Sequence, residues 1–247
     1  MSNQLREEFL SLVSGTRSLL EDMRDLGIEE VLFPPPMEPP APQSAYETDA
    51  VLPGPVQVAE TLSEGLEDIC RELDGCRRCP LCEGRNRLVF GGGNPQAELV
   101  FVGEAPGREE DRQGIPFVGE AGQLLERILF AMNLHRDDVY ICNVIKCRPP
   151  GNRDPKPEEI EACEPFLKRQ LAVIRPKVLV TLGKFAAQTL LRERMPISRL
   201  RGHWREYEGI PLMPTYHPAF LLRNPASKKE VWIDMKKVME KLFSAAK

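Results

Sequence analysis

The chain has 247 residues, of which 42% are hydrophobic and 28% are charged, and its formal net charge is −4. This length allows one full-sized globular domain and not two of ordinary size. No apolar run approaches the roughly 18 residues that a membrane span needs, and the N-terminus lacks the pattern of a secretion signal. We therefore expect a cytoplasmic protein that does not interact with membranes.

The charge is distributed unevenly along the chain. Residues 1–75 contain 4 Lys and Arg against 16 Asp and Glu, whereas residues 76–247 contain 29 basic and 21 acidic side chains. A basic C-terminal body suits a polyanionic partner, and an acidic N-terminus would be repelled by one.

Residues 1–32 predict an acidic amphipathic helix. Its apolar side chains recur at alternating spacings of four and three, at Leu5, Phe9, Leu12, Leu19, Met23 and Leu26, with Thr16 as the one polar interruption. One helix cannot bury such a stripe alone, so we expect it to bind its own body, a second copy of the chain or a protein partner. Residues 33–60 are rich in proline and predict a disordered linker. We interpret helix and linker together as an accessory tether without chemistry.

Residues 61–247 have the pattern of a globular domain. A short helix around Glu64–Leu73, with Ser63 as its N-cap, is followed by strands that alternate with helices. The expected strands are Leu99–Val102, Val139–Ile145, Val178–Leu182 and Leu212–Tyr216, and the expected helices are Gly122–Asn133, Pro157–Ile174, Lys184–Arg194 and Lys228–Phe243. This order predicts a three-layer α/β/α sandwich on a mainly parallel four-stranded sheet. In such sheets the ligand site lies beyond the carboxyl ends of the strands.

Four of the seven cysteines form two pairs. Cys76 and Cys79 make a C-x2-C pair, and Cys147 and Cys163 are 16 residues apart. Two pairs of thiolates can bind zinc or hold an iron–sulfur cluster. The second pair is too wide for a zinc ribbon, which favours a cluster, although zinc and no metal both stay open on spacing alone.

The turn after the first expected strand reads Gly103-Glu104-Ala105-Pro106-Gly107 and is followed by further carboxylates. A glycine-framed turn at a strand end offers main-chain N–H groups to an anion or a carbonyl group. It is not a P-loop, because no Gly-Lys-Ser/Thr follows. The carboxylates would repel phosphate, and they suit a site that orients water or stabilises positive charge.

The fourth expected strand ends in Tyr216-His217-Pro218-Ala219. A histidine at the carboxyl end of a strand is well placed for acid–base or hydrogen-bonding work, whereas His135 and His203 lack such a context. The next residues, Leu221-Leu222-Arg223, have the composition of a wedge that enters a DNA duplex. Packing of the last helix explains this apolar pair equally well.

Taken together, these segments resemble the iron–sulfur uracil-DNA glycosylases called family 4, over roughly residues 76–242. The resemblance rests on several motifs in the same order: Cys76-Arg-Arg-Cys79, Gly103-Glu-Ala-Pro-Gly107 with Glu110-Asp111, Gly114-Ile-Pro-Phe-Val-Gly119, Asn143-Val-Ile-Lys-Cys147-Arg-Pro-Pro150 and His217-Pro-Ala-Phe-Leu-Leu-Arg-Asn224. It implies a DNA-repair enzyme that hydrolyses the N-glycosidic bond of uracil in single- or double-stranded DNA and leaves an abasic site.

The resemblance also implies roles for individual residues. Phe117 would stack on the flipped uracil, Asn143 would read its edge, and His217 would contact its O2 atom. Glu104 would lie beside the sugar. Ala105 stands in the uracil-binding turn where other members of the superfamily carry a water-activating aspartate, so that task falls to Glu104 or Glu110.

The resemblance implies further that a [4Fe-4S] cluster is held by Cys76, Cys79, Cys147 and Cys163. Cys82 falls where the family pattern needs no ligand. Cys70 and Cys142 lie within helical and strand patterns, and we expect them to be buried hydrophobic side chains.

Elementary chemistry agrees with these roles. An enzyme that acts on a base takes it out of the stack and holds it by stacking and by hydrogen bonds to its edge. A side-chain amide accepts from N3–H of uracil and donates to O4, a pattern that cytosine reverses.

Two alternative functions compete with this one. A metal-stabilised nucleic-acid-binding module would leave the residues at the strand ends unexplained. A hydrolase of small nucleotides would have no use for a wedge.

Overall fold

The computed structural model describes residues 64–244 and, nearer the N-terminus, residues 13, 14, 16, 17, 20, 21, 23–25 and 27. The described positions from 13 to 25 are helical, where the sequence predicts a helix. Met23 is buried, and Asp25 forms a 3.1 Å ion pair with Lys228 near the C-terminal helix. The predicted linker over 33–60 and the predicted N-cap Ser63 lie outside the described residues.

The described chain is built on a six-stranded mixed sheet in the order β1-β3-β2-β4-β6-β5. The strands are β1 (Gly92–Gly93), β2 (Leu99–Gly103), β3 (Tyr140–Asn143), β4 (Val178–Leu182), β5 (Arg205–Tyr207) and β6 (Ile210–Thr215). The four central strands are parallel, as predicted, and β1 and β5 pair antiparallel at the two edges. The predicted count of four strands was wrong, because the two edge strands are short and lack an apolar run.

Helices follow the strands in the expected alternation. They are α2 (Leu66–Leu73), α3 (Arg108–Gln113), α4 (Glu120–Ala131), α5 (Pro157–Ile174), α6 (Lys184–Leu191), α7 (Ile197–Leu200), α8 (Pro218–Arg223) and α9 (Lys228–Phe243), with short 3-10 turns η1 (Pro80–Cys82), η2 (Arg136–Asp138), η3 (Pro150–Asn152) and η4 (Pro225–Ser227). The predicted bounds of α5 and α9 are confirmed. Helix α2 begins two residues later than predicted, with Gly65 as its N-cap.

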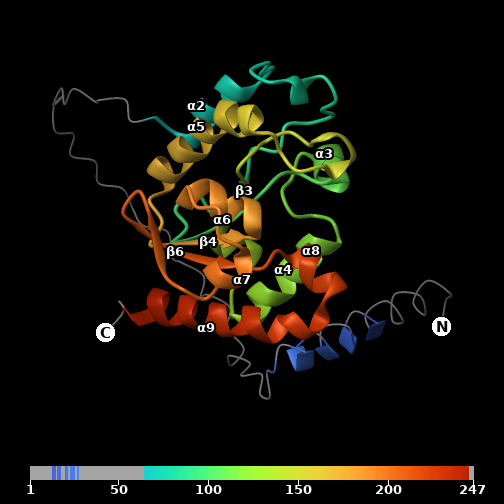
Figure 1. The fold of residues 1–247 in the computed structure, drawn as a ribbon, viewed down its shortest axis with the longest axis vertical. Coiled ribbons are helices and arrows are strands. Elements are labelled where there is room, and N and C mark those ends of the chain that lie inside the picture. Colours follow the sequence, from blue (N-terminus) through green and yellow to red (C-terminus); the bar gives the residue numbers. More distant parts are fainter. Residues whose placement is uncertain are drawn as a thin grey trace, which may run out of the picture.

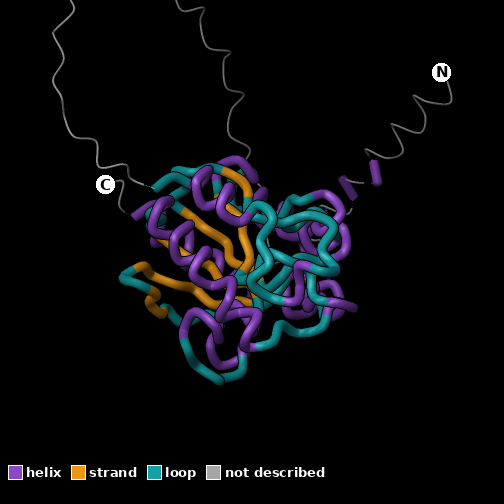
Figure 2. Tube along the Cα trace, turned by 90° about the horizontal axis from the view of Figure 1, so that it is seen from above, coloured by secondary structure: helices purple, strands orange, loops and turns teal. Residues whose placement is uncertain are grey.

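The sheet lies between two helical layers. One face packs against α4, α8 and α9, and the other packs against α5 and α6. Figure 1 shows α9 along one side of the strands and α5 along the opposite side, and Figure 2 shows the orange strands enclosed by helices. Strands β2 and β4 are buried at every position because both faces are covered. The predicted α/β/α sandwich is therefore confirmed.

The register of the parallel strands brings several chain segments to one edge of the sheet. Gly103, the last residue of β2, pairs with Asn143, the last residue of β3. The main-chain N–H of Gly183, directly after β4, donates to Thr215, the last residue of β6. The turns that leave these strands therefore begin side by side. In the described part of the chain, no helix is long and apolar enough to cross a membrane.

Candidate active site

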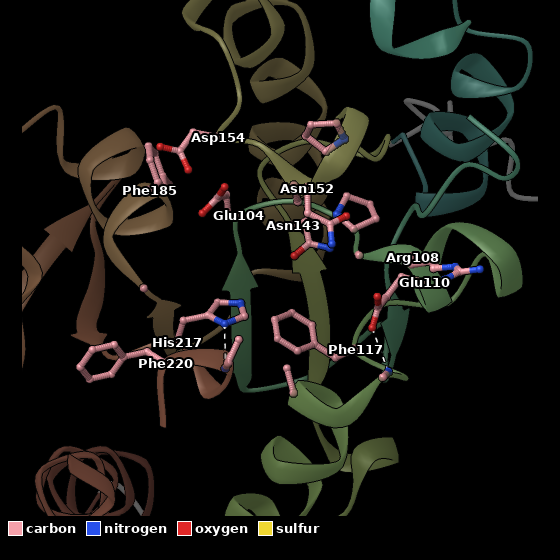
Figure 3. A pocket seen from close by; sticks show the side chains of 18 of the residues that line it. Glu104, Arg108, Glu110, Phe117, Asn143, Asn152, Asp154, Phe185, His217 and Phe220 are labelled. Atoms are coloured by element: carbon pink, nitrogen blue, oxygen red, sulfur yellow. Dashed lines mark hydrogen bonds between the residues drawn. The ribbon is translucent and has the colours of Figure 1, made fainter. Parts of the chain in front are cut away.

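A pocket of about 720 Å³ opens at the carboxyl ends of these strands. It is lined from several separate segments, and Figure 3 shows the side chains that project into it. The predicted site residues Glu104, Ala105, Glu110, Phe117, Asn143 and His217 all line this one pocket. The structure thus brings together residues that are up to 113 positions apart in the sequence.

Asn143 is 1% exposed, and its side-chain oxygen Oδ1 is buried without a hydrogen-bond partner among the described residues. A buried polar atom without a partner costs about 1–3 kcal/mol, so such an atom is poised to accept a hydrogen bond from a ligand. The neighbouring Gly103 makes room for it, because a Cβ atom there would collide with Asn143 Oδ1 and with the Phe117 ring.

Phe117 forms the opposite wall of the same space. Its ring centroid lies 5.6 Å from that of His217, with 31° between the ring planes. Phe117 adopts a left-handed backbone conformation with φ of 52°, which is rare for an aromatic residue. The turn that holds this conformation is therefore under a local constraint.

Glu110 acts on that turn. Its Oε1 atom accepts hydrogen bonds from the main-chain N–H groups of Val118 at 2.9 Å and Gly119 at 3.0 Å. Gly119 is the N-cap of α4, so the carboxylate satisfies N–H groups at the start of that helix. This anchoring role was not predicted, and it favours Glu104 over Glu110 as the group that activates water.

His217 is held in one tautomer by its own helix. It is the N-cap of α8, and its Nδ1 atom accepts a hydrogen bond from the Ala219 N–H at 3.1 Å. Burial lowers the pKa of His217 to about 4, and the positive charge of Arg223 adds to the decrease. At neutral pH the ring is therefore uncharged and carries its proton on Nε2, the atom that is free to donate to a ligand.

Glu104 has the opposite electrostatic environment. Burial raises the pKa of Glu104 to about 7, the negative charge of Asp154 adds to the increase, and Lys184 opposes it. In Figure 3 Glu104 lies across the pocket from His217, with Asp154 beside it. A carboxyl group that titrates near neutral pH can both stabilise positive charge and accept a proton from water.

The structure corrects one part of the predicted wedge. Leu221 is fully buried in the core against α4, because the short helix α8 turns it away from solvent. Leu222 is 39% exposed, and Arg223 is exposed and lines the pocket. Of the three predicted wedge residues, Leu222 and Arg223 are therefore the two that can project toward a ligand outside the pocket.

The cysteines gather at a second, smaller pocket formed by the segment after α2, the loop after β3 and α5. The residues Cys76, Cys79, Cys82, Cys147 and Cys163 all line it. Within the described residues, no three metal-binding side chains are arranged to hold a single metal ion. Cys142 is buried within β3, as expected, and Cys70 is partly buried in α2.

Donor groups point at the sulfur atoms of this pocket. The Arg85 guanidinium donates to Cys147 Sγ at 3.2 Å, and the main-chain N–H of Lys146 donates to Cys163 Sγ at 3.3 Å. Burial raises the pKa of the Cys163 thiol to about 11. The donors nevertheless suit a site that takes sulfur in its thiolate form, since N–H groups and positive charge stabilise thiolate.

Several residues that support the pocket were not identified from the sequence. Arg136 donates to the main-chain oxygens of Pro116 and Phe117, and the buried Lys146 donates to the main-chain oxygen of Asn143. Arg136 lies outside every motif and has no local signal. Lys146 does have one, because it is the charged residue in the otherwise apolar segment that follows Asn143.

Comparisons with known proteins show which family the chain resembles. The family model described as "Uracil DNA glycosylase superfamily" matches residues 90–236. A type-4 uracil-DNA glycosylase of Archaeoglobus fulgidus is 50% identical over 185 residues, which cover 72% of this chain and 93% of that protein. A type-4 uracil-DNA glycosylase of Sulfurisphaera tokodaii is 45% identical over 72% of this chain and 84% of that protein. A type-5 uracil-DNA glycosylase of Pyrobaculum aerophilum is 30% identical over 62% of this chain and 82% of that protein.

Proposed function

The chain belongs to the uracil DNA glycosylase superfamily and, within it, to the type-4 uracil-DNA glycosylases, and on that premise we propose that it removes uracil from DNA by hydrolysis of the N-glycosidic bond. The observation that carries the proposal is the Oδ1 atom of Asn143, which is buried and has no hydrogen-bond partner in the part of the chain that the structure describes, in a pocket walled by Phe117 and His217. This pocket offers a side-chain amide, an aromatic face and a neutral histidine.

These three groups match a flipped uracil. Asn143 Oδ1 accepts the N3–H group, and the amide nitrogen of the same side chain donates to O4. The Phe117 ring stacks on the face of the base. The Nε2–H group of His217 donates to O2. Cytosine presents an acceptor at N3 and a donor at the neighbouring position, so it would leave Asn143 with two mismatched contacts.

Bond cleavage places charge where the pocket can stabilise it. The electron pair of the bond between C1′ and N1 moves onto the uracil ring, where the proton on His217 Nε2 stabilises the negative charge at O2. Positive charge develops on the sugar, and the ionised Glu104 stabilises it. Glu104 then accepts a proton from the water that attacks C1′, which leaves an abasic site. The uracil anion takes up a proton from solvent when it leaves, and Glu104 returns its own proton to solvent.

We propose that Cys76, Cys79, Cys147 and Cys163 hold a [4Fe-4S] cluster. Support comes from the pocket that these four cysteines line together with Cys82, and from the donor groups directed at the sulfur atoms of Cys147 and Cys163. A cluster of several irons spans ligands that stand farther apart than those around one ion. Its iron–thiolate bonds would cross-link the segment after α2, the loop after β3 and α5.

We also propose that DNA binds across the mouth of the pocket, with Leu222 and Arg223 of α8 at the gap that the flipped base leaves. The net charge of +8 over residues 76–247 supports a polyanionic ligand. A cytoplasmic location and a protein partner for the N-terminal helix stay predictions.

The direct test of this function uses an oligonucleotide with one uracil, both single-stranded and paired with guanine or adenine. Alkali after incubation should cut the strand at the abasic site, and matched strands with cytosine or thymine should stay intact. Release of free uracil should equal the number of cut strands. Binding of these strands without release of uracil would favour a non-catalytic module instead.

A further inference from the structure

The turn between α3 and α4 carries Phe117 in a strained conformation. With φ at 52°, Phe117 lies in the left-handed region, which is unfavourable for a residue other than glycine. Its side chain is only 5% exposed, and its ring packs against Gly103. Strain of this kind persists only when surrounding groups hold the backbone in place.

Two charged side chains hold this turn from opposite ends. On one side Glu110 accepts the N–H groups of Val118 and Gly119. On the other side Arg136 donates through Nη1 to the Phe117 oxygen at 2.9 Å and through Nη2 to the Pro116 oxygen. The turn thus offers its N–H groups to an anion and its carbonyl groups to a cation.

Arg136 is suited to this task by its shape and by its environment. It begins η2, and its side chain is 22% exposed, with Glu126 Oε1 3.4 Å from Nη1. The planar guanidinium can donate to two consecutive carbonyl groups at once, which a lysine ammonium does not match geometrically. The Phe117 oxygen is also closely packed, because a Cβ atom at Gly122 would collide with it.

We propose that Arg136 is a positioning residue for base recognition: it fixes the carbonyl groups of Pro116 and Phe117 so that the Phe117 ring is already in place to stack on uracil. This inference rests on the proposed function, because it assumes that Phe117 stacks on the base. Arg136 itself does not line the pocket. Its effect on uracil therefore passes through the turn that carries Phe117.

This dependence predicts a specific pattern in a double-mutant cycle. Arg136→Ala should weaken binding of free uracil and lower kcat/KM roughly tenfold or more, the range for loss of one base–aromatic stack. Phe117→Ala should have an effect at least as large. The double variant should be no worse than Phe117→Ala, since residues that act through one another are not additive. Calorimetric titration with free uracil measures the binding affinity, which does not depend on turnover.

Three further variants separate positioning from general stability. Glu126→Gln removes the ion pair and leaves both carbonyl contacts, so uracil affinity should stay at the wild-type value. Arg71→Ala removes an exposed arginine on α2 and serves as a matched control for charge. Arg136→Lys should retain the melting temperature and still lose uracil affinity, which keeps the test valid if Arg136→Ala does not fold. Guanidinium ion at non-denaturing concentration should partly restore uracil binding to Arg136→Ala.

Additive losses in the cycle, or wild-type uracil affinity in both Arg136→Lys and Arg136→Ala, would overturn the proposal. A wild-type protein that neither binds uracil nor releases it from DNA would overturn the proposed function instead. The two failures are therefore distinguishable in the same set of measurements.

Discussion

The fully buried ammonium group of Lys146 donates to the main-chain oxygen of Asn143 at 2.8 Å, at the strand end that carries the proposed uracil-reading amide. It also donates to Gln170 Oε1 at 2.5 Å. The main-chain N–H of the same lysine donates to Cys163 Sγ. A single residue thus joins the pocket of thiols to the base-reading end of the active site, so damage at one should be felt at the other.

Cys147→Ser is expected to reduce both stability and uracil excision. Metal binding contributes free energy to folding. Loss of a ligand should therefore lower the free energy of unfolding by more than about 4 kcal/mol, which corresponds to a decrease in melting temperature of about 10 °C or more. The purified wild-type protein should be yellow-brown and contain iron, and the variant should lose both properties. Cys82→Ser is the matched control and should change little. Colourless wild-type protein with one zinc and full activity would contradict the cluster.

Gly103→Ala tests the close packing beneath the base. The added methyl group would collide with Asn143 Oδ1 and the Phe117 ring, so uracil excision should fall by roughly a hundredfold or more, while overpacking costs about 1–3 kcal/mol of stability. Gly84→Ala is the control, since a Cβ atom at Gly84 meets nothing within 4 Å. Binding to abasic DNA should survive in both variants. Wild-type excision by Gly103→Ala would show that the base binds elsewhere.

The activity should depend on pH through Glu104. The carboxyl group is neutral below its pKa of about 7 and ionised above it, so kcat/KM should rise about tenfold per pH unit below pH 7 and then level off. His217, with a pKa of about 4, stays neutral over this range and adds no slope. The Glu104→Gln variant should have a low kcat/KM that does not rise with pH. The same rise in Glu104→Gln would assign the titration to another group.

The same substitution has a stability consequence that can be measured without DNA. The folded-state pKa of Glu104 lies above its ordinary value, so its ionisation destabilises the fold as the pH rises through about 7. Glu104→Gln should therefore raise the melting temperature at pH 8 and leave it nearly unchanged at pH 4, where the carboxyl group is mostly neutral in both states.

Deletion of residues 1–60 should leave the chemistry intact. The deletion removes 11 acidic and 3 basic residues, so the truncated chain is less negative and should bind non-specific DNA equally well or more tightly at low salt. The ion pair between Asp25 and Lys228 is lost, which costs a modest amount of stability. A truncated protein that folds but does not release uracil would mean that the N-terminal helix completes the active site.

The sequence predicts most of the parallel core because its strands are short apolar runs separated by helical periods. It also identifies polar residues near strand ends: His217 directly follows the fourth predicted strand, whereas Asn143 lies within the second predicted strand, Val139–Ile145, and is the last residue of β3 in the structure. The edge strands β1 and β5 were missed because they are held by pairing with a neighbour rather than by an apolar pattern. Leu221 was misassigned because a six-residue helix has too little periodicity to show which side chain turns inward.

The charge states and supporting contacts of the site could not be predicted from local sequence. The neutral form of His217 depends on burial among distant segments, and its tautomer depends on a main-chain N–H from Ala219. The role of Arg136 depends on a contact across 19 residues between η2 and the Phe117 turn. Such relationships arise only when the segments are packed together.

Asn143→Asp tests the central claim that the Asn143 amide selects uracil. The carboxylate still accepts from N3–H but repels O4, so kcat/KM for uracil should fall by roughly a hundredfold or more, equivalent to about 3 kcal/mol or above. The measurement is a paired assay of uracil, cytosine and thymine strands with this variant and with His217→Ala, which should be slow but should keep its choice of base. The predicted result for Asn143→Asp is a large decrease in kcat/KM on uracil strands, with at most slight release of cytosine. Wild-type uracil rates in Asn143→Asp would contradict the assignment and transfer base reading to another residue.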